Sequence, residues 1–217
     1  MIIMEKGKLI VFEGGEGCGK TTISNMVYNW MQENNIDCIK SREPGGTAIG
    51  DDIRNILLNK EYSDNIDAFS ELLLYEAARR EHFIQIIDPA LKSGKHVILD
   101  RFILTTSVYQ GGDRDDFDSY TRLINKLNNL AINYTKIDCT ILLDIDPAIS
   151  MRRIKDNNRE TNRYDLASLE YQRKVRDLYK IKSTFYKNRY IIDADNSQDK
   201  IFNEVLQIIK GVIEYDK

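Results

Sequence analysis

The 217-residue sequence predicts one α/β domain in which a five-stranded parallel sheet lies between two layers of helices. Three observations lead to this fold class. Short apolar runs alternate with long segments of helical periodicity, a phosphate-binding loop follows the first apolar run, and no linker or internal repeat divides the chain. Strand–helix alternation requires right-handed crossovers, so helices cover both faces and ligands bind at the carboxyl ends of the strands.

The predicted strands are short apolar runs, and the predicted helices carry apolar residues at spacings of three and four. The strands are Leu9–Glu13, Cys38–Ser41, His96–Asp100, Thr140–Asp144 and Tyr190–Asp193. The helices are Thr21–Asn34, Gly50–Asn59, Asp67–Leu91, Asp118–Asn133, Pro147–Lys155, Leu166–Lys187 and Gln198–Tyr215. All of them belong to a single domain over residues 1–217, and the polar segment 155–165 forms a loop or flap within it.

Composition and charge exclude several classes of protein. The net charge of −3 gives no reason to expect nucleic-acid binding. No apolar run reaches 18 residues and no secretory signal is visible, so we expect neither a membrane span nor export. The three cysteines (Cys18, Cys38 and Cys139) are widely spaced without a CxxC pair, which is typical of a reducing, cytoplasmic location.

The segment GGEGCGKTT (residues 14–22) is the strongest motif in the chain. Its glycines let backbone N–H groups point into one concavity, Lys20 can reach β- and γ-phosphates, and the Thr21 hydroxyl can ligate Mg²⁺. The following helix adds the partial positive charge of its N-terminus. A glycine-rich turn could match by chance, but the strand before it and the helix after it favour a nucleoside triphosphate site. The expected ATP contacts are Gly14, Gly15, Glu16, Gly17, Cys18, Gly19, Lys20, Thr21 and Thr22.

The carboxylate at the end of another predicted strand fits the same nucleoside triphosphate site. Asp100 ends an apolar strand and is placed to hold Mg²⁺ or one of its waters. A GTPase would carry Asn-Lys-x-Asp after a strand, whereas NKLN (residues 125–128) lacks the aspartate and lies in a helical stretch. A motor or transporter ATPase would be larger or carry further sensor motifs. Arginines near predicted strand ends suit a second phosphorylated substrate: Arg42, Arg54, Arg79, Arg101 and Arg114.

Three further motifs carry a family resemblance. REPGGT (42–47), DRF (100–102) and YQGG (109–112) occur in this order after the phosphate loop. Together they make the chain resemble the thymidylate kinase family from its first strand to its last helix. The resemblance implies a P-loop nucleoside monophosphate kinase-like fold and Mg²⁺-dependent transfer of the ATP γ-phosphate to dTMP, giving dTDP for dTTP biosynthesis. It also implies a homodimer, in which the helix at 67–91, apolar on two faces, packs on a second subunit.

The resemblance further implies roles for individual residues. Lys20 and Arg101 act in catalysis, Thr21 and Asp100 place Mg²⁺, and Arg54 helps Arg101 to clamp the dTMP phosphate. The implied dTMP contacts are Glu16, Glu43, Arg54, Tyr75, Arg79, Arg101, Thr105, Thr106, Tyr109 and Gln110. Glu16 bonds the sugar 3′-hydroxyl, and Glu43 lies beside the clamp and orients its arginine or metal-bound waters. Thr105, Thr106 and Gln110 lie near the base.

Two of the implied base contacts have physical requirements of their own. Tyr75 stands where the family commonly has a stacking Phe, and its hydroxyl needs a partner. Arg79 matches an arginine that bonds a thymine oxygen, although its spacing from Glu76 also fits a helical ion pair. Tyr109 would crowd a ribose 2′-hydroxyl. A kinase of wider specificity, accepting dUMP for example, and a catalytically silent nucleotide-binding protein remain alternatives, although intact Lys20 argues against the latter.

The phosphate loop lacks a feature that some thymidylate kinases have. Glu16, Gly17 and Cys18 fill the space where an arginine can stand, and none of them is basic. Charge on the transferred phosphoryl group must therefore be met from elsewhere. Arg159 and Arg163, four residues apart in the polar segment 155–165, are the candidates for this catalytic role. Without the resemblance, a solvated charge cluster would be the simpler interpretation of the pair.

Overall fold

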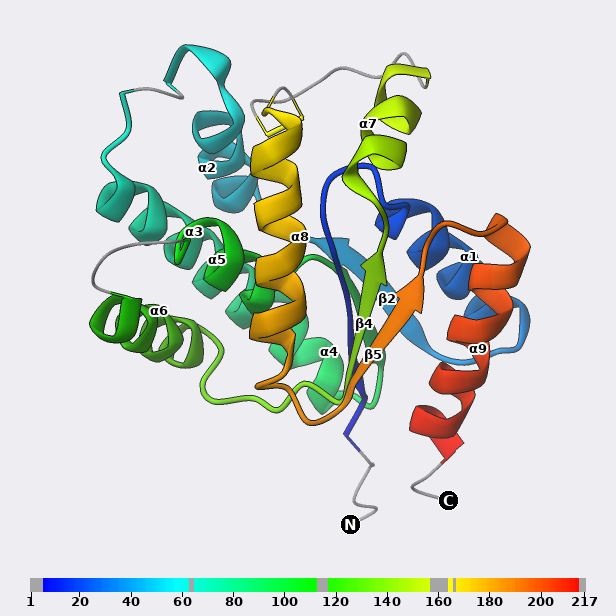
Figure 1. Cartoon of the computed structure of the whole chain (residues 1–217). Helices are drawn as coiled ribbons and strands as arrows, with labels where there is room; N and C mark the ends of the chain where they lie inside the picture. Colours follow the sequence, from blue (N-terminus) through cyan, green and yellow to red (C-terminus); the bar gives the residue numbers. More distant parts are fainter. Residues whose placement is uncertain (1–5, 63–64, 113–116, 157–163, 166, 215–217) are drawn as a thin grey trace.

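The computed structural model describes residues 6–62, 65–112, 117–156, 164–165 and 167–214. Within these ranges, residues 117 and 118 are described by their backbone alone. Its core is a five-stranded parallel sheet in the order β2-β3-β1-β4-β5 (Figure 1). The strands are β1 (Leu9–Glu13), β2 (Cys38–Arg42), β3 (His96–Asp100), β4 (Cys139–Asp144) and β5 (Arg189–Asp193). The predicted fold class is confirmed, and each predicted strand is present with its ends shifted by at most one residue.

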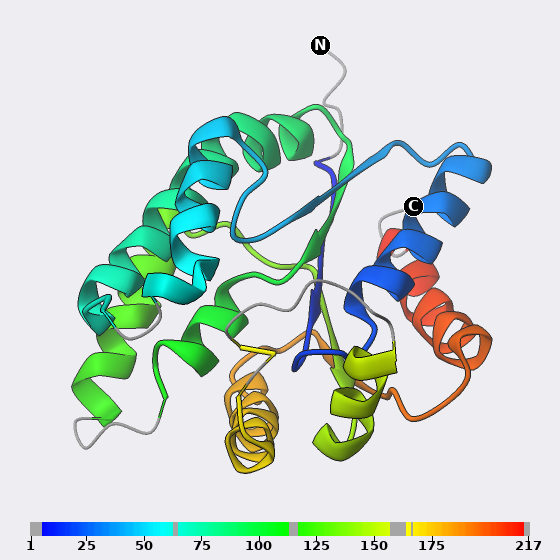
Figure 2. The ribbon, with the colours of Figure 1, turned by 90° about the horizontal axis from the view of Figure 1, so that it is seen from above.

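Helices cover both faces of the sheet (Figures 1 and 2). The α-helices are α1 (Lys20–Glu33), α2 (Ala48–Leu58), α3 (Ala68–His82), α4 (Asp88–Lys92), α5 (Ile103–Tyr109), α6 (Phe117–Ala131), α7 (Pro147–Asp156), α8 (Leu169–Ser183) and α9 (Gln198–Glu214). A 3₁₀ turn, η1 (Lys60–Tyr62), follows α2. No helix within the described ranges is both long and apolar enough to cross a membrane.

Each face of the sheet has its own apolar core. The face toward α1 and α9 buries Phe12, Val27 and Val205 among others. The opposite face buries Val11, Leu99 and Phe102 against α4 and its neighbours, and a smaller cluster joins α5 to α8. Helices α2, α3 and α6 pack outside this second layer, α3 lying against both α2 and α6. The three central strands β1, β3 and β4 are therefore buried on both sides, which explains why they are nearly continuous apolar runs.

The predicted helix over 67–91 is not continuous. Helix α3 ends at His82, a π-helical segment η2 (Phe83–Ile87) follows, and α4 then begins at Asp88. Pro89 explains the break, because proline has no N–H to donate and its ring crowds the carbonyl one turn earlier. The chain widens locally, and Asp88 N–H donates to the carbonyl oxygen of Phe83, five residues back.

Helix α5 was not among the predicted elements. Its sequence, ILTTSVY, contains a run of β-branched residues and has no side-chain cap of its own. Glu13, at the end of β1, supplies the missing acceptor: its Oε1 accepts the N–H groups of Phe102 (3.0 Å) and Thr105 (3.3 Å). A residue about ninety positions away in sequence thus completes the start of this helix.

The strand order brings the predicted motifs to one edge. β1 lies between β3 and β4, and Phe12 pairs with Asp100 in register. The phosphate loop after β1 and the DRF motif after β3 are therefore neighbours. β2 pairs with β3 on the other side, Arg42 opposite Asp100, so that REPGGT begins at the same edge. This is the carboxyl edge of the parallel sheet, where ligands bind in folds of this type.

Candidate active site

The phosphate loop connects the end of β1 to the start of α1. Gly14 has a φ of 140°, and a Cβ on it would lie 2.5 Å from the carbonyl oxygen of Leu143, so only glycine fits. Lys20 opens α1 and is buried. Its Nζ donates to the carbonyl oxygens of Gly14 (3.0 Å) and Gly15 (2.7 Å), which fixes the ammonium group beside the loop.

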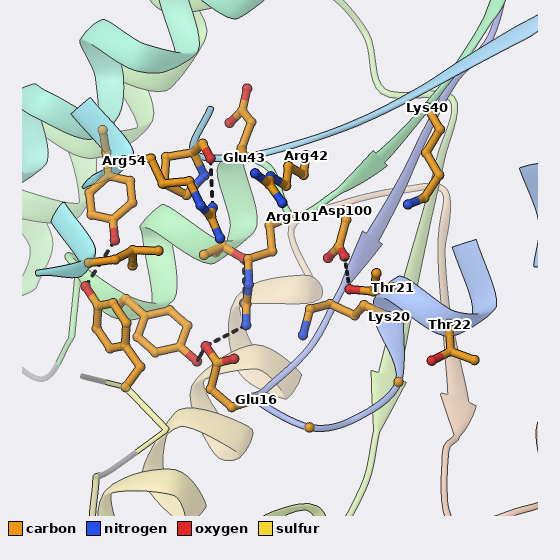
Figure 3. Close-up of a pocket in the computed structure, with 18 residues that line it drawn as sticks. Glu16, Lys20, Thr21, Thr22, Lys40, Arg42, Glu43, Arg54, Asp100 and Arg101 are labelled. Atoms are coloured by element: carbon orange, nitrogen blue, oxygen red, sulfur yellow. Dashed lines mark hydrogen bonds and ion pairs between the residues drawn. The ribbon is translucent and has the colours of Figure 1, made fainter. Parts of the chain in front are cut away.

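A cavity of about 490 Å³ opens beside this loop (Figure 3). Five basic side chains and three carboxylates line it, so its charge favours an anionic ligand although the whole chain is acidic. The predicted site residues that line it are Glu16, Gly17, Gly19, Lys20, Thr21, Thr22, Glu43, Arg54, Tyr75, Asp100, Arg101, Thr105 and Tyr109. Gly14 and Gly15 border a smaller hollow of about 20 Å³ on the side of β4, and Cys18 is buried in the core beneath the loop.

Arg101 projects into the cavity from a strained position directly after β3. Its φ of 70° lies in the left-handed region, which residues with a side chain rarely adopt. Its Nη2 donates to Glu16 Oε1 at 2.7 Å, and its guanidinium lies over the ring of Tyr109. Burial alone would lower the pKa of Arg101, but Glu16 and the neighbouring tyrosines raise it well above its usual value. Arg101 therefore remains a fixed cation.

Thr21 and Asp100 meet where the expected metal site lies. Thr21 Oγ1 donates to Asp100 Oδ2 at 2.5 Å, and both side chains line the cavity. A hydroxyl and a carboxylate are oxygen ligands of the kind that Mg²⁺ prefers. Among the described residues, no group of three or more His, Cys, Asp and Glu side chains could hold a metal ion. Two protein ligands, completed by phosphate oxygens and water, fit the way in which Mg²⁺ binds with nucleotides.

The REPGGT segment builds the wall opposite the phosphate loop. Thr47 caps α2 by accepting the N–H of Gly50 at 3.0 Å, and α2 carries Arg54 back toward the segment. Arg54 Nη1 donates to the carbonyl oxygen of Pro44 at 2.8 Å, which holds the guanidinium at the cavity wall. Burial and the nearby Arg42 lower the pKa of Arg54. Arg54 and Arg101 thus present two cations to one cavity.

Tyr75 has the partner that its hydroxyl requires. The hydroxyl lies 3.1 Å from that of Tyr164, which itself donates to Glu71 Oε1 at 2.8 Å. The ring of Tyr164 packs edge-on against Tyr109. Gln110, predicted to lie near the base, does not line the cavity, and its Nε2 donates to the same Glu71 oxygen at 3.0 Å. Aromatic rings from three segments therefore enclose this end of the site.

Arg79 is buried and bonded to side chains from several elements. It is 2% exposed and does not line the cavity. Its Nε donates to Glu43 (2.8 Å), its Nη1 to Glu76 (2.7 Å) and Asn128 (2.6 Å), and its Nη2 to Thr106 (2.9 Å). The helical ion pair with Glu76 is thus present. Thr106, predicted as a base neighbour, is the acceptor for Arg79 rather than a cavity residue.

Glu43 and Thr105 line the cavity but are bonded away from it. Glu43 Oε2 accepts from Arg79, which is not one of the two arginines of the predicted clamp, and Oε1 lies 3.2 Å from Nδ1 of the fully buried His82. A Cβ on Gly46 would lie 2.6 Å from this imidazole, so the REPGGT glycine leaves room for it. Thr105 Oγ1 donates to Glu13 at 2.6 Å, beneath Arg101 rather than at a base edge.

Some cavity residues were not predicted as site residues. They are Lys40, Arg42, Pro44, Leu58 and Tyr164. The sequence could have predicted Lys40 as a cavity residue, because it lies two positions before Arg42 in a strand and therefore shares its face. No pattern in the sequence predicts that Tyr164 lines the cavity. The predicted lid residues Arg159 and Arg163, and also Arg114, lie outside the described residues.

Comparison with known proteins identifies the relatives of this chain. The family model for thymidylate kinase matches residues 12–205. A thymidylate kinase of Clostridium novyi (strain NT) is 44% identical over 95% of this chain and all of its own length. That of Legionella pneumophila (strain Paris) is 40% identical over 97% of each chain.

A solved structure shows the same likeness. The crystal structure of thymidylate kinase from Ehrlichia chaffeensis matches with a TM-score of 0.69 at 32% identity. The match covers 94% of this chain and 99% of that one. The resemblance inferred from the motifs is therefore confirmed, for both the sequence and the fold.

Proposed function

Because this chain belongs to the thymidylate kinase family, it is an enzyme that phosphorylates dTMP to dTDP, and we propose that ATP and dTMP meet in the cavity at the carboxyl edge of its sheet. The arrangement of cations carries this assignment. Lys20 lies at one side of the cavity, and Arg54 and Arg101 lie at another. Two phosphate-bearing ligands facing each other would account for both groups.

The phosphate-loop side takes ATP. Backbone N–H groups of the loop and the N-terminus of α1 bind its phosphates, and Lys20 neutralises charge on the β- and γ-phosphates. Thr21 and Asp100 would hold Mg²⁺, which when bound would supply positive charge that neutralises the phosphates. Their mutual hydrogen bond supports this role, since it places the two oxygens side by side before any ligand arrives.

The opposite side takes dTMP. Arg101 and Arg54 bind its phosphate, Tyr75 packs against its base, and Tyr109 stands where a 2′-hydroxyl would project. Glu16, already bonded to Arg101, accepts the sugar 3′-hydroxyl as a second donor. Behind this wall, Arg79 has one Nη2 hydrogen without a partner among the described residues, and this hydrogen is the donor that we assign to a thymine oxygen.

Phosphoryl transfer requires alignment of the two substrates and neutralisation of the charge on the transferred group, but no general base. The attacking atom is an oxygen of the dTMP phosphate, which is already deprotonated at neutral pH. Arg101 and Arg54 orient this oxygen, and Lys20 stabilises the charge that shifts toward the departing ADP. We assign the remaining transition-state charge to Arg159 and Arg163, because no residue between Gly15 and Gly19 is basic.

We further propose a cytoplasmic homodimer. Phe69, Leu73 and Ile84 follow one another along α3 and η2 and are 44%, 44% and 43% exposed. Apolar side chains in a row on a helix surface are typical of an interface, and a second copy of this chain is the occupant that we assign. All three cysteines are free and buried thiols, in keeping with the cytoplasm.

One assay tests the proposed specificity. ADP release is measured with dTMP, dUMP, dCMP and dGMP as acceptors, for the wild type and for Lys20→Ala. We expect dTMP to be the preferred acceptor and Lys20→Ala to lose activity with every acceptor. Equal kcat/KM for dTMP and dGMP would contradict the assignment of the aromatic wall to the thymine base.

A further inference from the structure

Two buried side chains that no motif singles out lie directly beneath Arg101. Glu13 ends β1 and has no exposed surface, and Tyr179 projects from α8 with 2% exposure. Thr105 connects them: its Oγ1 donates to Glu13 Oε2 at 2.6 Å and lies 2.8 Å from the Tyr179 hydroxyl. Arg101 Nη1 donates to that hydroxyl at 3.0 Å. The four groups come from β1, α5, α8 and the turn after β3.

With Glu13 ionised, the hydrogens in this chain of bonds run in one direction. Arg101 is a donor only, so the Tyr179 oxygen accepts from it and the tyrosine proton is directed to Thr105. The threonine proton in turn goes to Glu13, a carboxylate that only accepts when ionised. With Glu13 ionised, the result is a continuous path from a guanidinium cation through two hydroxyls to a buried carboxylate. Charged groups at both ends strengthen each bond between them.

The same carboxylate holds the backbone on which Arg101 is strained. Glu13 Oε1 accepts the N–H of Phe102, the residue directly after the positive φ of Arg101. The backbone N–H of Arg101 donates to the carbonyl oxygen of Phe12, one residue before Glu13. The end of β1 therefore fixes the strained backbone from both sides, and the hydroxyl chain fixes the end of the side chain.

These contacts occupy only part of the guanidinium. Nη1 is used by the Tyr179 hydroxyl, by Gly14 O (3.1 Å) and by Thr105 Oγ1 (3.3 Å). Nη2 donates one hydrogen to Glu16. Among the described residues, Nε and one of the two Nη2 hydrogens have no partner, so both donors are available to a phosphate. The buried chain thus determines which donors of Arg101 a phosphate can meet.

We propose that Tyr179 is a positioning residue for Arg101, which it orients toward the 5′-phosphate of dTMP through the chain of hydrogen bonds to Thr105 and Glu13. This proposal rests on the proposed function, in which Arg101 binds that phosphate. The alternative is that Tyr179 only packs, since its ring lies in the apolar cluster of α5 and α8 with Leu104, Val108 and Val175.

Tyr179→Phe separates the two roles, because it keeps the ring and removes only the hydroxyl. Equilibrium dissociation constants are measured for dTMP and for thymidine, which has the same base and sugar but no phosphate. We expect the variant to weaken dTMP binding by about tenfold, as fits the loss of a hydrogen bond to a charged group, and thymidine binding by less than about twofold. Kinetically, KM for dTMP rises and KM for ATP is unchanged.

Tyr186→Phe is the matched control. Tyr186 also packs partly buried between α5 and β-sheet neighbours, but its hydroxyl bonds Ser107 rather than Thr105 or Arg101. It should lose stability in urea to a similar extent as Tyr179→Phe and bind dTMP as the wild type does. Equal effects of the two variants on the dTMP constant would overturn the proposal.

Arg101→Ala distinguishes failure of the inference from failure of the proposed function. If it leaves the ratio of dTMP to thymidine affinity unchanged, Arg101 does not bind the phosphate, and both ideas fall. If it abolishes the ratio while Tyr179→Phe preserves it, only the positioning role is refuted. We expect Tyr179→Phe to have no further effect on dTMP binding in the Arg101→Ala background, as coupled residues require.

Discussion

Arg79 offers the sharpest test of the buried charge network. Arg79→Met keeps an unbranched side chain of similar length on α3 but removes the guanidinium. The wild-type group makes four hydrogen bonds of 2.6–2.9 Å, two of them to carboxylates, from a position that is 2% exposed. Its removal leaves Glu43 and Glu76 buried without their cation.

The expected cost is large. Breaking a buried ion pair by removing one partner destabilises a protein by about 3–5 kcal/mol. That is a large part of a typical unfolding free energy of about 5–15 kcal/mol. Urea denaturation at neutral pH measures this loss directly. The matched control is Arg80→Met on the same helix, because Arg80 is exposed and bonds mainly backbone carbonyls, and it should cost less than about 1 kcal/mol.

The pH dependence adds an independent check. Burial raises the pKa of Glu76, and Arg79 partly opposes this rise. Without Arg79 the pKa of Glu76 rises further, and a carboxyl group whose pKa is raised by folding stabilises the folded state at low pH and loses this contribution as pH increases. The deficit of Arg79→Met should therefore shrink on acidification, and Glu76→Gln should restore part of the stability at neutral pH. A loss below about 1 kcal/mol at neutral pH would refute the reasoning.

Four further outcomes are expected. Asp144→Asn should lower the unfolding free energy by about 1–2 kcal/mol at neutral pH. Burial raises the pKa of Asp144, but hydrogen bonds from Arg176 and Lys180 outweigh it and hold the pKa below its usual value, so the difference should disappear only as pH falls through that lowered pKa. A pH-independent difference in denaturation would contradict this. Asp100→Asn should weaken Mg²⁺-dependent binding of a fluorescent ATP analogue by about tenfold or more, and unchanged binding would exclude the metal role. The double variant Arg159→Ala/Arg163→Ala should cut kcat at least about a hundredfold with little change in ATP affinity, whereas near-normal kcat would leave the segment without a catalytic arginine. Leu73→Glu should turn a dimer into a monomer in sedimentation velocity, and a monomeric wild type would remove the proposed interface.

The parts of the fold that the sequence predicts are those encoded locally. Strand β3 is an apolar run because both faces of the sheet are covered there. The phosphate loop is recognisable because phosphate binding requires its glycines, Lys20 and Thr21 at fixed spacings. Helix α5 could not be predicted in the same way. Its β-branched sequence disfavours helix, and the acceptor that completes its start is Glu13, which reaches it only through the order of strands in the sheet.

The site shows the same division between local and distant determinants. The DRF motif and the family resemblance predict that Arg101 and Arg54 bind phosphate, and the structure brings both to one cavity. Sequence motifs do not show which partners a buried arginine will bond. The structure shows that Arg79 lies in a polar network rather than at the cavity wall. Tyr164 and Tyr179 enter the site region from segments without any motif. Contacts made by tertiary packing leave no trace in local spacing.

The destination of the ATP γ-phosphate tests the proposed reaction most directly. ATP labelled with ³²P in the γ position is incubated with dTMP, Mg²⁺ and the enzyme, and the labelled products are separated. We expect the label to appear in dTDP, at the β-phosphate, in equal amount to the ADP formed, and we expect Lys20→Ala to abolish its appearance. Label released as inorganic phosphate while dTMP remains unchanged would contradict the proposed reaction, because the cavity would then bind ATP without holding a nucleotide acceptor.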